Sequence, residues 1–175
     1  MSVYSNREFL TPEECQQAIS LFPPPAPALT EIGDAIVAHR TIRTGRSSFL
    51  SPTNANFLTA KLEAAVQRAN NLLWQFEIIG FEPFQLAEYR EGDGYDWHLD
   101  IGPSASTRKV SLTVQLSDPA DYDDGDLEIF GQAPADRACG SATIFPGYLL
   151  HRVTLVTRGI RYALVAWAHG AIPFR

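Results

Sequence analysis

Apolar and polar positions follow different periods in the two halves of the chain. Up to about residue 75, two segments repeat at helical spacing, whereas from residue 77 short apolar or alternating runs are separated by Gly, Pro and Asp. Helices followed by a long series of strands are typical of one β core with helices packed outside it. We therefore expect a mostly β protein, an antiparallel sandwich or barrel with N-terminal supporting helices.

The first predicted helix has clear start signals. Thr11 suits the N-cap, Pro12 the first helical position and Glu14 the reciprocal partner of a capping box. This helix should end before Pro23, and a second, longer one is predicted from Thr53 to about Gln75.

Short runs in the second half predict strands at Glu77–Phe81, Phe84–Tyr89, Asp96–Ile101, Lys109–Ser117, Asp126–Phe130, Ala142–Phe145, Leu149–Val156 and Ile160–Ala168. A short strand and then a loop are expected over residues 35–50, and residues 39–56 are a candidate lid. We expect one domain over residues 1–175. In it, residues 1–76 form a helical support and residues 77–170 form the β core.

Composition narrows the classes of function. The chain has 14 Lys+Arg and 20 Asp+Glu, a net charge of −6, and no basic run, which argues against non-specific nucleic-acid binding. It has no apolar stretch long enough for a membrane span and no basic start followed by an apolar leader, so we expect a cytoplasmic protein. Two cysteines, Cys15 and Cys139, cannot form a four-cysteine zinc site and are expected to be buried thiols.

The chemistry centres on a His-x-Asp pair. His98 and Asp100 stand at i and i+2, so on a strand their side chains would share one face. His151, in another strand-like run, is the best candidate for a third ligand. Two imidazoles and one carboxylate form the facial triad of non-haem Fe(II) oxygenases, which leaves three coordination positions open. His39 and His169 are interpreted as structural histidines.

Residues 156–160 predict a hairpin with a three-residue loop and Gly159 in the left-handed conformation. Leu155 would then oppose Arg161, and His151 and Arg161 would share a face about four residues apart, roughly 13 Å. That separation suits a small dianion that chelates a metal at one end and meets a guanidinium at the other.

The run Lys109–Ser117 alternates apolar residues with Ser111, Thr113 and Gln115. One polar face on a central strand is what a barrel interior needs in order to hold a polar ligand. Arg40, Arg43 and Arg46 are interpreted as surface charges. The alternative is that they lie on the lid and meet an acidic or peptide substrate.

Four stretches together resemble the 2-oxoglutarate/Fe(II)-dependent oxygenases of the prolyl 4-hydroxylase and PKHD type: Tyr89–Asp100, Arg108–Ser117, Tyr122–Glu128 and Phe145–Trp167. The resemblance implies a double-stranded β-helix, or jelly roll, with Fe(II) held by His98, Asp100 and His151. It implies that Arg161 pairs with the 5-carboxylate of 2-oxoglutarate, with Tyr89, Gln115 and Thr113 near this co-substrate. O2 would be the second co-substrate, and ascorbate is an optional reductant.

Three functions remain open. The first is hydroxylation of a prolyl or other residue in a peptide or protein, with 2-oxoglutarate converted to succinate and CO2. The second is the same chemistry on a free amino acid or another small molecule. The third is a non-enzymatic jelly-roll binding module, which the complete triad together with Arg161 disfavours. The sequence leaves the oligomeric state open.

Overall fold

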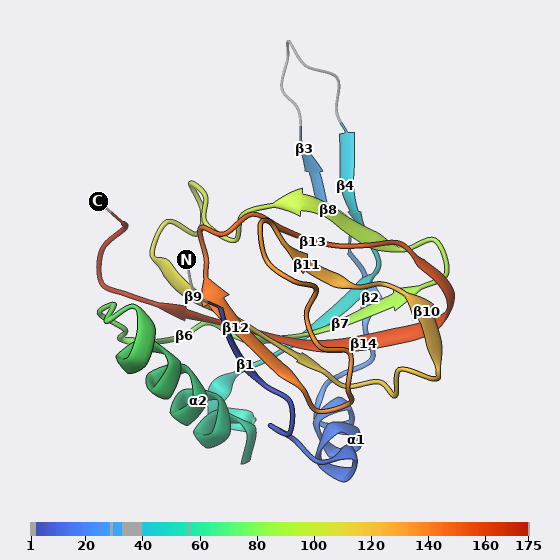
Figure 1. Ribbon diagram of the computed structural model, residues 1–175, viewed down its shortest axis with the longest axis horizontal. Helices are drawn as coiled ribbons and strands as arrows, with labels where there is room; N and C mark the ends of the chain where they lie inside the picture. The colour runs from blue at the N-terminus through green and yellow to red at the C-terminus, as the bar shows by residue number, and fades with distance from the viewer. Residues whose placement is uncertain (1–2, 29, 33–39, 56, 175) are drawn as a thin grey trace.

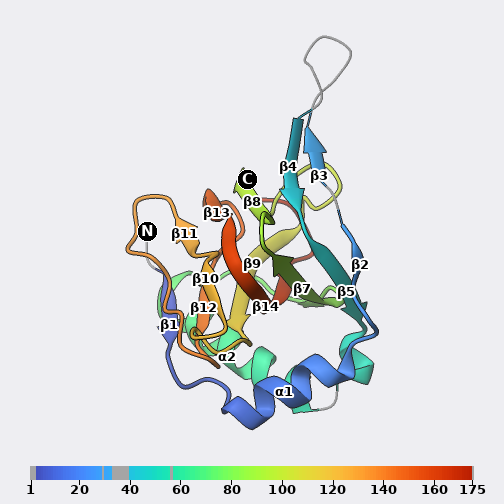
Figure 2. The same ribbon diagram turned by 90° about the vertical axis from the view of Figure 1, so that its right-hand side faces the viewer.

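The computed structural model describes residues 3–28, 30–32, 40–55 and 57–174. Two antiparallel sheets face each other, and the helices cover the outer face of the larger one (Figures 1 and 2). No helix in the described part of the chain is long and apolar enough to cross a bilayer.

The larger sheet has nine strands, in the order β1-β12-β9-β14-β7-β5-β2, with β6 and β10 also paired to β14. Its strands are β1 (Tyr4–Asn6), β2 (Ala26–Pro27), β5 (Arg46–Leu50), β6 (Gly80–Phe81), β7 (Phe84–Arg90), β9 (Arg108–Gln115), β10 (Tyr122–Asp124), β12 (Ala142–Pro146) and β14 (Val156–His169).

The smaller sheet has five strands in the order β11-β13-β8-β4-β3. They are β3 (Thr30–Ile32), β4 (Arg40–Thr44), β8 (Gly94–His98), β11 (Leu127–Ile129) and β13 (His151–Val153). The β3 and β4 strands extend away from the body of the molecule (Figure 1).

The helices are α1 (Pro12–Leu21), the 3-10 turn η1 (Pro52–Asn54) and α2 (Phe57–Leu73). The predicted capping box at the start of α1 is confirmed, because the Thr11 hydroxyl accepts from the Glu14 amide and the Glu14 carboxylate accepts from the Thr11 amide. The second helix begins later than predicted, since η1 occupies the segment after Ser51.

The alternation in β9 determines which face meets the core and which meets the interior between the sheets. Val110, Leu112 and Val114 are fully buried and belong to the same apolar core as Leu58 and Leu62 of α2. The intervening side chains point to the other face of the strand, toward the smaller sheet. The polar interior face predicted from this alternation is therefore present.

Two predictions of local structure were wrong. Residues 40–50 form two strands, β4 and β5, where one short strand and then a loop were expected over residues 35–50, and the two strands join different sheets. The expected hairpin at residues 156–160 does not form, because β14 runs unbroken from Val156 to His169. Gly159 does adopt the predicted left-handed φ of 78°, but there it lies opposite Tyr122 of β10.

Candidate metal centre and co-substrate pocket

The structure brings the three predicted metal-ligating side chains together between the sheets. His98 ends β8, His151 begins β13, and the two residues are paired across these neighbouring strands. Asp100 lies two residues beyond His98, past the end of β8. The two side chains were expected to share one face of a continuous strand. They come together here because the chain bends after the strand ends.

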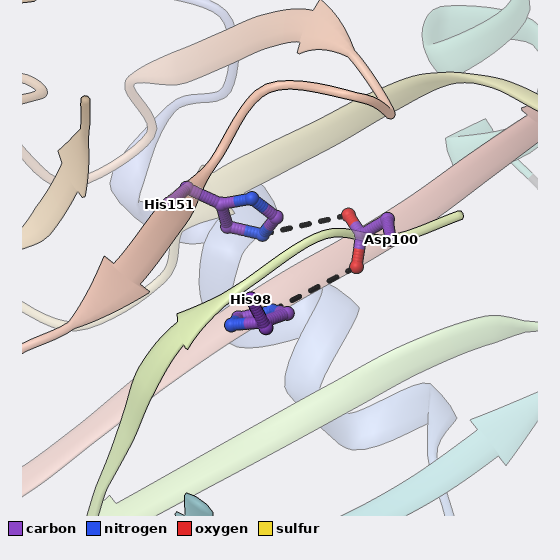
Figure 3. Close-up of side chains that lie close together, drawn as sticks. All are labelled: His98, Asp100 and His151. Carbon is purple, nitrogen blue, oxygen red and sulfur yellow. Dashed lines mark ion pairs between the residues drawn. The ribbon is translucent and has the colours of Figure 1, made fainter. Parts of the chain in front are cut away.

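The triad is compact and buried. The His98 Nε2 atom lies 3.8 Å from one Asp100 carboxylate oxygen, and the His151 Nε2 atom lies 3.5 Å from the other (Figure 3). One ligand atom from each residue falls within 4.8 Å of the others.

Hydrogen bonds orient both imidazoles. The Nδ1 atom of His98 lies 2.8 Å from the Asp96 carbonyl oxygen, and that of His151 lies 2.9 Å from the Leu149 carbonyl oxygen. Because a carbonyl oxygen only accepts, each Nδ1 carries the proton and each Nε2 presents a lone pair toward Asp100. Both histidines therefore have the tautomer that a metal ligand requires.

Electrostatics favour the charge states that bind a cation. Burial, together with the neighbouring His151, lowers the pKa of His98 to about 4, so its imidazole is neutral at pH 7. Burial opposes ionisation of Asp100, but His151 and the Ser111 hydroxyl, 2.5 Å from the carboxylate, hold the pKa of this carboxyl below its ordinary value. Two imidazoles and one carboxylate fit the donor set of an Fe(II) facial triad.

A cavity of about 280 Å³ opens beside the triad. Arg161 lines it and is only 1% exposed. Its Nε donates to the Gln115 side-chain oxygen at 3.1 Å, and its guanidinium carbon lies 5.6 Å from the centroid of the Tyr89 ring. Both terminal nitrogens, Nη1 and Nη2, are buried and have no hydrogen-bond partner among the described residues. Thr113 also lines this cavity.

An unpaired guanidinium in such a place indicates an anionic ligand. Leaving buried donors unsatisfied costs about 1–3 kcal/mol each, and more for charged groups, unless a ligand accepts from them. The two free nitrogens are adjacent prongs of one planar fork, which matches the two oxygens of a carboxylate. The pocket can thus bind a carboxylate at Arg161 and a metal at the triad.

The route by which Arg161 reaches the site differs from the prediction. His151 lies in the smaller sheet and Arg161 in the larger one, so the two face each other across the interior and do not share one strand face. Leu155, expected on that face, is 60% exposed. The chain crosses between the sheets immediately after β13, which local turn signals around Gly159 could not reveal.

Several residues of the site were missed as functional side chains. Tyr95 stacks on His98 with ring centroids 3.4 Å apart and an interplanar angle of 8°. Arg108 makes two hydrogen bonds to Glu82, of 2.8 and 2.6 Å, donates to the Asp100 carbonyl oxygen and lies over the Trp167 ring. The alternation of β9 pointed to Ser111. The other contacts join separate strands and have no local signal.

The remaining predicted residues have varied surroundings. Arg43 is half-buried and lines the cavity, whereas Arg46 pairs with buried Glu88 at 3.4 Å. His39 and the side chain of Arg40 lie outside the described residues. The expectation for the two thiols is confirmed for Cys15, which is fully buried, while Cys139 is half-buried.

Comparison with known proteins supports the same interpretation of the site. A PKHD-type hydroxylase of Pseudomonas putida strain W619 is 38% identical over 94 residues, which are 48% of this chain and 42% of the relative. A PKHD-type hydroxylase of Hyphomonas neptunium is 34% identical over 143 residues, 77% of this chain and 63% of the relative. The chain thus spans less than two thirds of either relative.

Solved structures agree on the fold. A prolyl hydroxylase from Trichoplax adhaerens, in complex with a peptide fragment of the oxygen degradation domain of hypoxia inducible factor, superposes with a TM-score of 0.73 at 18% identity. That match covers 95% of this chain and 83% of the other. A Pseudomonas putida prolyl-4-hydroxylase gives a TM-score of 0.69 at 21% identity, covering 96% and 92%.

These structural likenesses confirm the predicted jelly roll. Residues 84–169, which contain the triad and Arg161, match the family described as the 2OG-Fe(II) oxygenase superfamily. This match and the PKHD-type relatives confirm the resemblance of the β core to the 2OG-Fe(II) oxygenase superfamily.

Proposed function

We propose that the protein is an Fe(II)- and 2-oxoglutarate-dependent dioxygenase that hydroxylates an unactivated C–H bond, with a prolyl residue of a peptide or protein as the leading substrate class. The observation that carries this proposal is the buried Arg161 fork, with two unpaired nitrogens, in the same cavity as a His-Asp-His triad. Neither feature alone specifies this chemistry, since a triad without an anion site would serve many metals and a lone arginine many anions.

In this proposal His98, Asp100 and His151 hold the metal. When bound, Fe(II) supplies the oxidising chemistry in which 2-oxoglutarate and O2 are consumed and succinate, CO2 and a hydroxylated product are formed. Ser111 orients the Asp100 carboxylate, and the backbone carbonyls behind the two imidazoles keep their rings in place. Ascorbate belongs to the same proposal as a reductant that keeps the metal ferrous.

Arg161 binds the far carboxylate of the co-substrate. Gln115 holds the guanidinium by its Nε, so both terminal nitrogens remain directed at the ligand. Because Arg161 is buried, a carboxylate there is screened little by water, and the charge-assisted pair is stronger than an exposed one. Tyr89 packs beside this pair and Thr113 lines the same cavity, where its hydroxyl offers a further hydrogen bond.

The peptide substrate is supported by the kinship with PKHD-type hydroxylases and by the structural likeness to prolyl hydroxylases, one of them in complex with a peptide. The second candidate is the same chemistry on a free amino acid or a similar small molecule. Both candidates use the same metal and co-substrate residues.

Turnover of 2-oxoglutarate tests the proposal. The Fe(II)-loaded protein should release succinate in air, and release should rise when a pool of Pro-rich peptides or of free amino acids contains a substrate. Arg161→Gln should lower release strongly at co-substrate concentrations that just saturate the wild type, and more 2-oxoglutarate should partly restore it. Arg158→Gln is the matched control, because Arg158 is exposed on the same strand and pairs with Asp123. No succinate from the wild type under any of these conditions would refute the proposed function.

A further inference from the structure

A second arginine of the cavity is left without a counter-ion by the function proposed above. Arg43, Asp100, Arg108 and Arg161 are the charged side chains that line the cavity, apart from its histidines. Asp100 belongs to the triad, and Arg108 is neutralised by its two hydrogen bonds to Glu82. Arg161 is assigned to the co-substrate, so Arg43 remains.

Arg43 is held in place beside the metal centre by its neighbours. It lies on β4, where its backbone pairs with Tyr95 of β8. Its guanidinium carbon lies 5.2 Å from the centroid of the Tyr95 ring, which in turn stacks on His98. The guanidinium, the phenol ring and the imidazole thus form a stacked series that ends at the triad.

Among the residues that the structure describes, the guanidinium of Arg43 has no hydrogen-bond or ion-pair partner. Its Nε is buried without a hydrogen-bond partner, and no ion pair joins Arg43 to an acidic group in the part of the chain that the structure describes. A cation packed on an aromatic face keeps its in-plane N–H groups directed outward, available to an acceptor that approaches in the plane of the fork.

We propose that Arg43 binds a carboxylate of the primary substrate and thereby selects substrates that carry a carboxylate near the C–H bond to be hydroxylated. The inference rests on the proposed function, because it assigns the co-substrate to Arg161. The cavity then has two anion positions, one at Arg161 on the larger sheet and one at Arg43 on the smaller sheet, with the triad lining the same cavity.

The charge and surface of the mouth support an acidic substrate with an apolar body. With 2-oxoglutarate bound at Arg161 and at the metal, Arg43 is the cation left uncompensated in a partly desolvated site, which favours an incoming anion. Phe49, Leu99, Leu127 and Val153 line the same cavity and offer apolar contacts to the rest of the substrate.

The test isolates the second anion position by filling the first. Protein labelled with ¹⁵N at the arginine Nε, loaded with redox-inert Zn(II) and saturating 2-oxoglutarate, is titrated with N-acetyl-L-proline and, separately, with N-acetyl-L-prolinamide. The Arg43 resonance is assigned by its absence from the Arg43→Gln spectrum. We expect it to shift with the acid, whose dissociation constant should be at least about tenfold lower than that of the amide.

Variants separate recognition from folding. Arg43→Gln should abolish the preference for the acid while leaving 2-oxoglutarate affinity unchanged. Arg152→Gln is the matched control, since Arg152 lies on β13 of the same sheet, pairs with Glu128 at 2.7 Å and stays outside the cavity lining. It should retain the preference.

Each of the remaining outcomes contradicts one of the two proposals. Equal affinity for acid and amide, no shift of Arg43 with either probe, or a shift confined to Arg161 would overturn the inference. Failure of 2-oxoglutarate to shift Arg161 in the first place would instead refute the proposed function. N-acetyl-Pro-Asp-amide and N-acetyl-Pro-Asn-amide then show whether the carboxylate comes from a peptide side chain or from a free acid.

Discussion

The two sheets contribute to the site in different ways. The larger sheet presents Arg161, Gln115 and Ser111 from long strands in continuous register, and these side chains are at most 4% exposed. The smaller sheet presents His98, His151 and Arg43 from strands of three to five residues, and both histidines stand at a strand end. The proposed co-substrate end is therefore part of the buried core, whereas the proposed metal ligands His98 and His151 lie where the chain enters loops.

Asp100 joins the two sheets. It follows β8 of the smaller sheet, yet its carboxylate accepts from Ser111 of the larger one. We therefore expect substitutions of the site residues in the smaller sheet to abolish metal binding. Substitutions in the larger sheet should weaken co-substrate binding or remove the hydrogen bond that holds the Asp100 carboxylate.

The largest effect is expected at the metal. His98→Ala should abolish Fe(II) retention and turnover, because the two remaining ligands hold Fe(II) poorly against water. Metal content after gel filtration and succinate release measure this, with His169→Ala as the control histidine. Metal retained at the wild-type level would contradict the assignment.

A selective loss is expected on the larger sheet. Arg161→Gln should raise the dissociation constant of 2-oxoglutarate about a hundredfold, since it removes a buried charge-assisted pair, while Fe(II) binding stays close to wild type. Calorimetric titration of the Mn(II)-loaded protein provides both values, and Arg158→Gln should behave as wild type. Equal loss of metal and co-substrate would make Arg161 a structural residue.

Ser111→Ala should have a smaller effect than the two substitutions above, and it should act through Asp100, the residue that joins the sheets. Loss of the hydrogen bond to Asp100 should weaken metal affinity about 10- to 100-fold, the range found when such outer contacts are removed. Ser48→Ala is a matched control, because this hydroxyl is buried in the same sheet and has no partner among the described residues. An identical change in both variants would show a packing effect only.

The smallest effect is expected from the ionisation of Cys15, which lies in α1 on the outer side of the larger sheet. Burial and the adjacent Cys139 raise the pKa of Cys15 to about 12, from an ordinary value of 9.0. The thiol therefore stays protonated in the folded protein, and the stability that this provides is present below pH 9 and lost as the pH rises toward 12.

The reaction of each cysteine with iodoacetamide reports whether its thiol ionises and can be reached. Iodoacetamide at pH 8 should label half-buried Cys139 and leave Cys15 unmodified until the protein unfolds, as read by peptide mass spectrometry. Labelling of Cys15 at the rate of Cys139 in the folded protein would show that this side of the sheet is open to solvent.

The sequence predicted those parts of the molecule that depend on local pattern. The capping box at Thr11, the alternation of β9 and the His-x-Asp spacing each involve residues that are close in the chain. The resemblance to a family supplied the role of Arg161, while the hairpin argument for its position was wrong. The path between the sheets after His151 depends on long-range pairing of β14 with β7, β9 and β10, which no local turn signal encodes.

The contact between Arg43 and Tyr95, which the sequence did not indicate, has the same physical origin. Arg43 and Tyr95 lie 52 residues apart in the chain, on strands that pair only in the folded sheet. Their contact cannot be predicted from the spacing of either one. It is this contact that places a second cation beside the triad.

The central claim is that one cavity binds both Fe(II) and 2-oxoglutarate, and anaerobic absorption spectroscopy tests it most directly. Adding 2-oxoglutarate to the Fe(II)-loaded protein should produce a metal-to-ligand charge-transfer band, because the co-substrate chelates the metal while Arg161 holds its far carboxylate. The band should be lost in His98→Ala and should require more 2-oxoglutarate in Arg161→Gln. A flat difference spectrum with the wild-type protein would contradict the account.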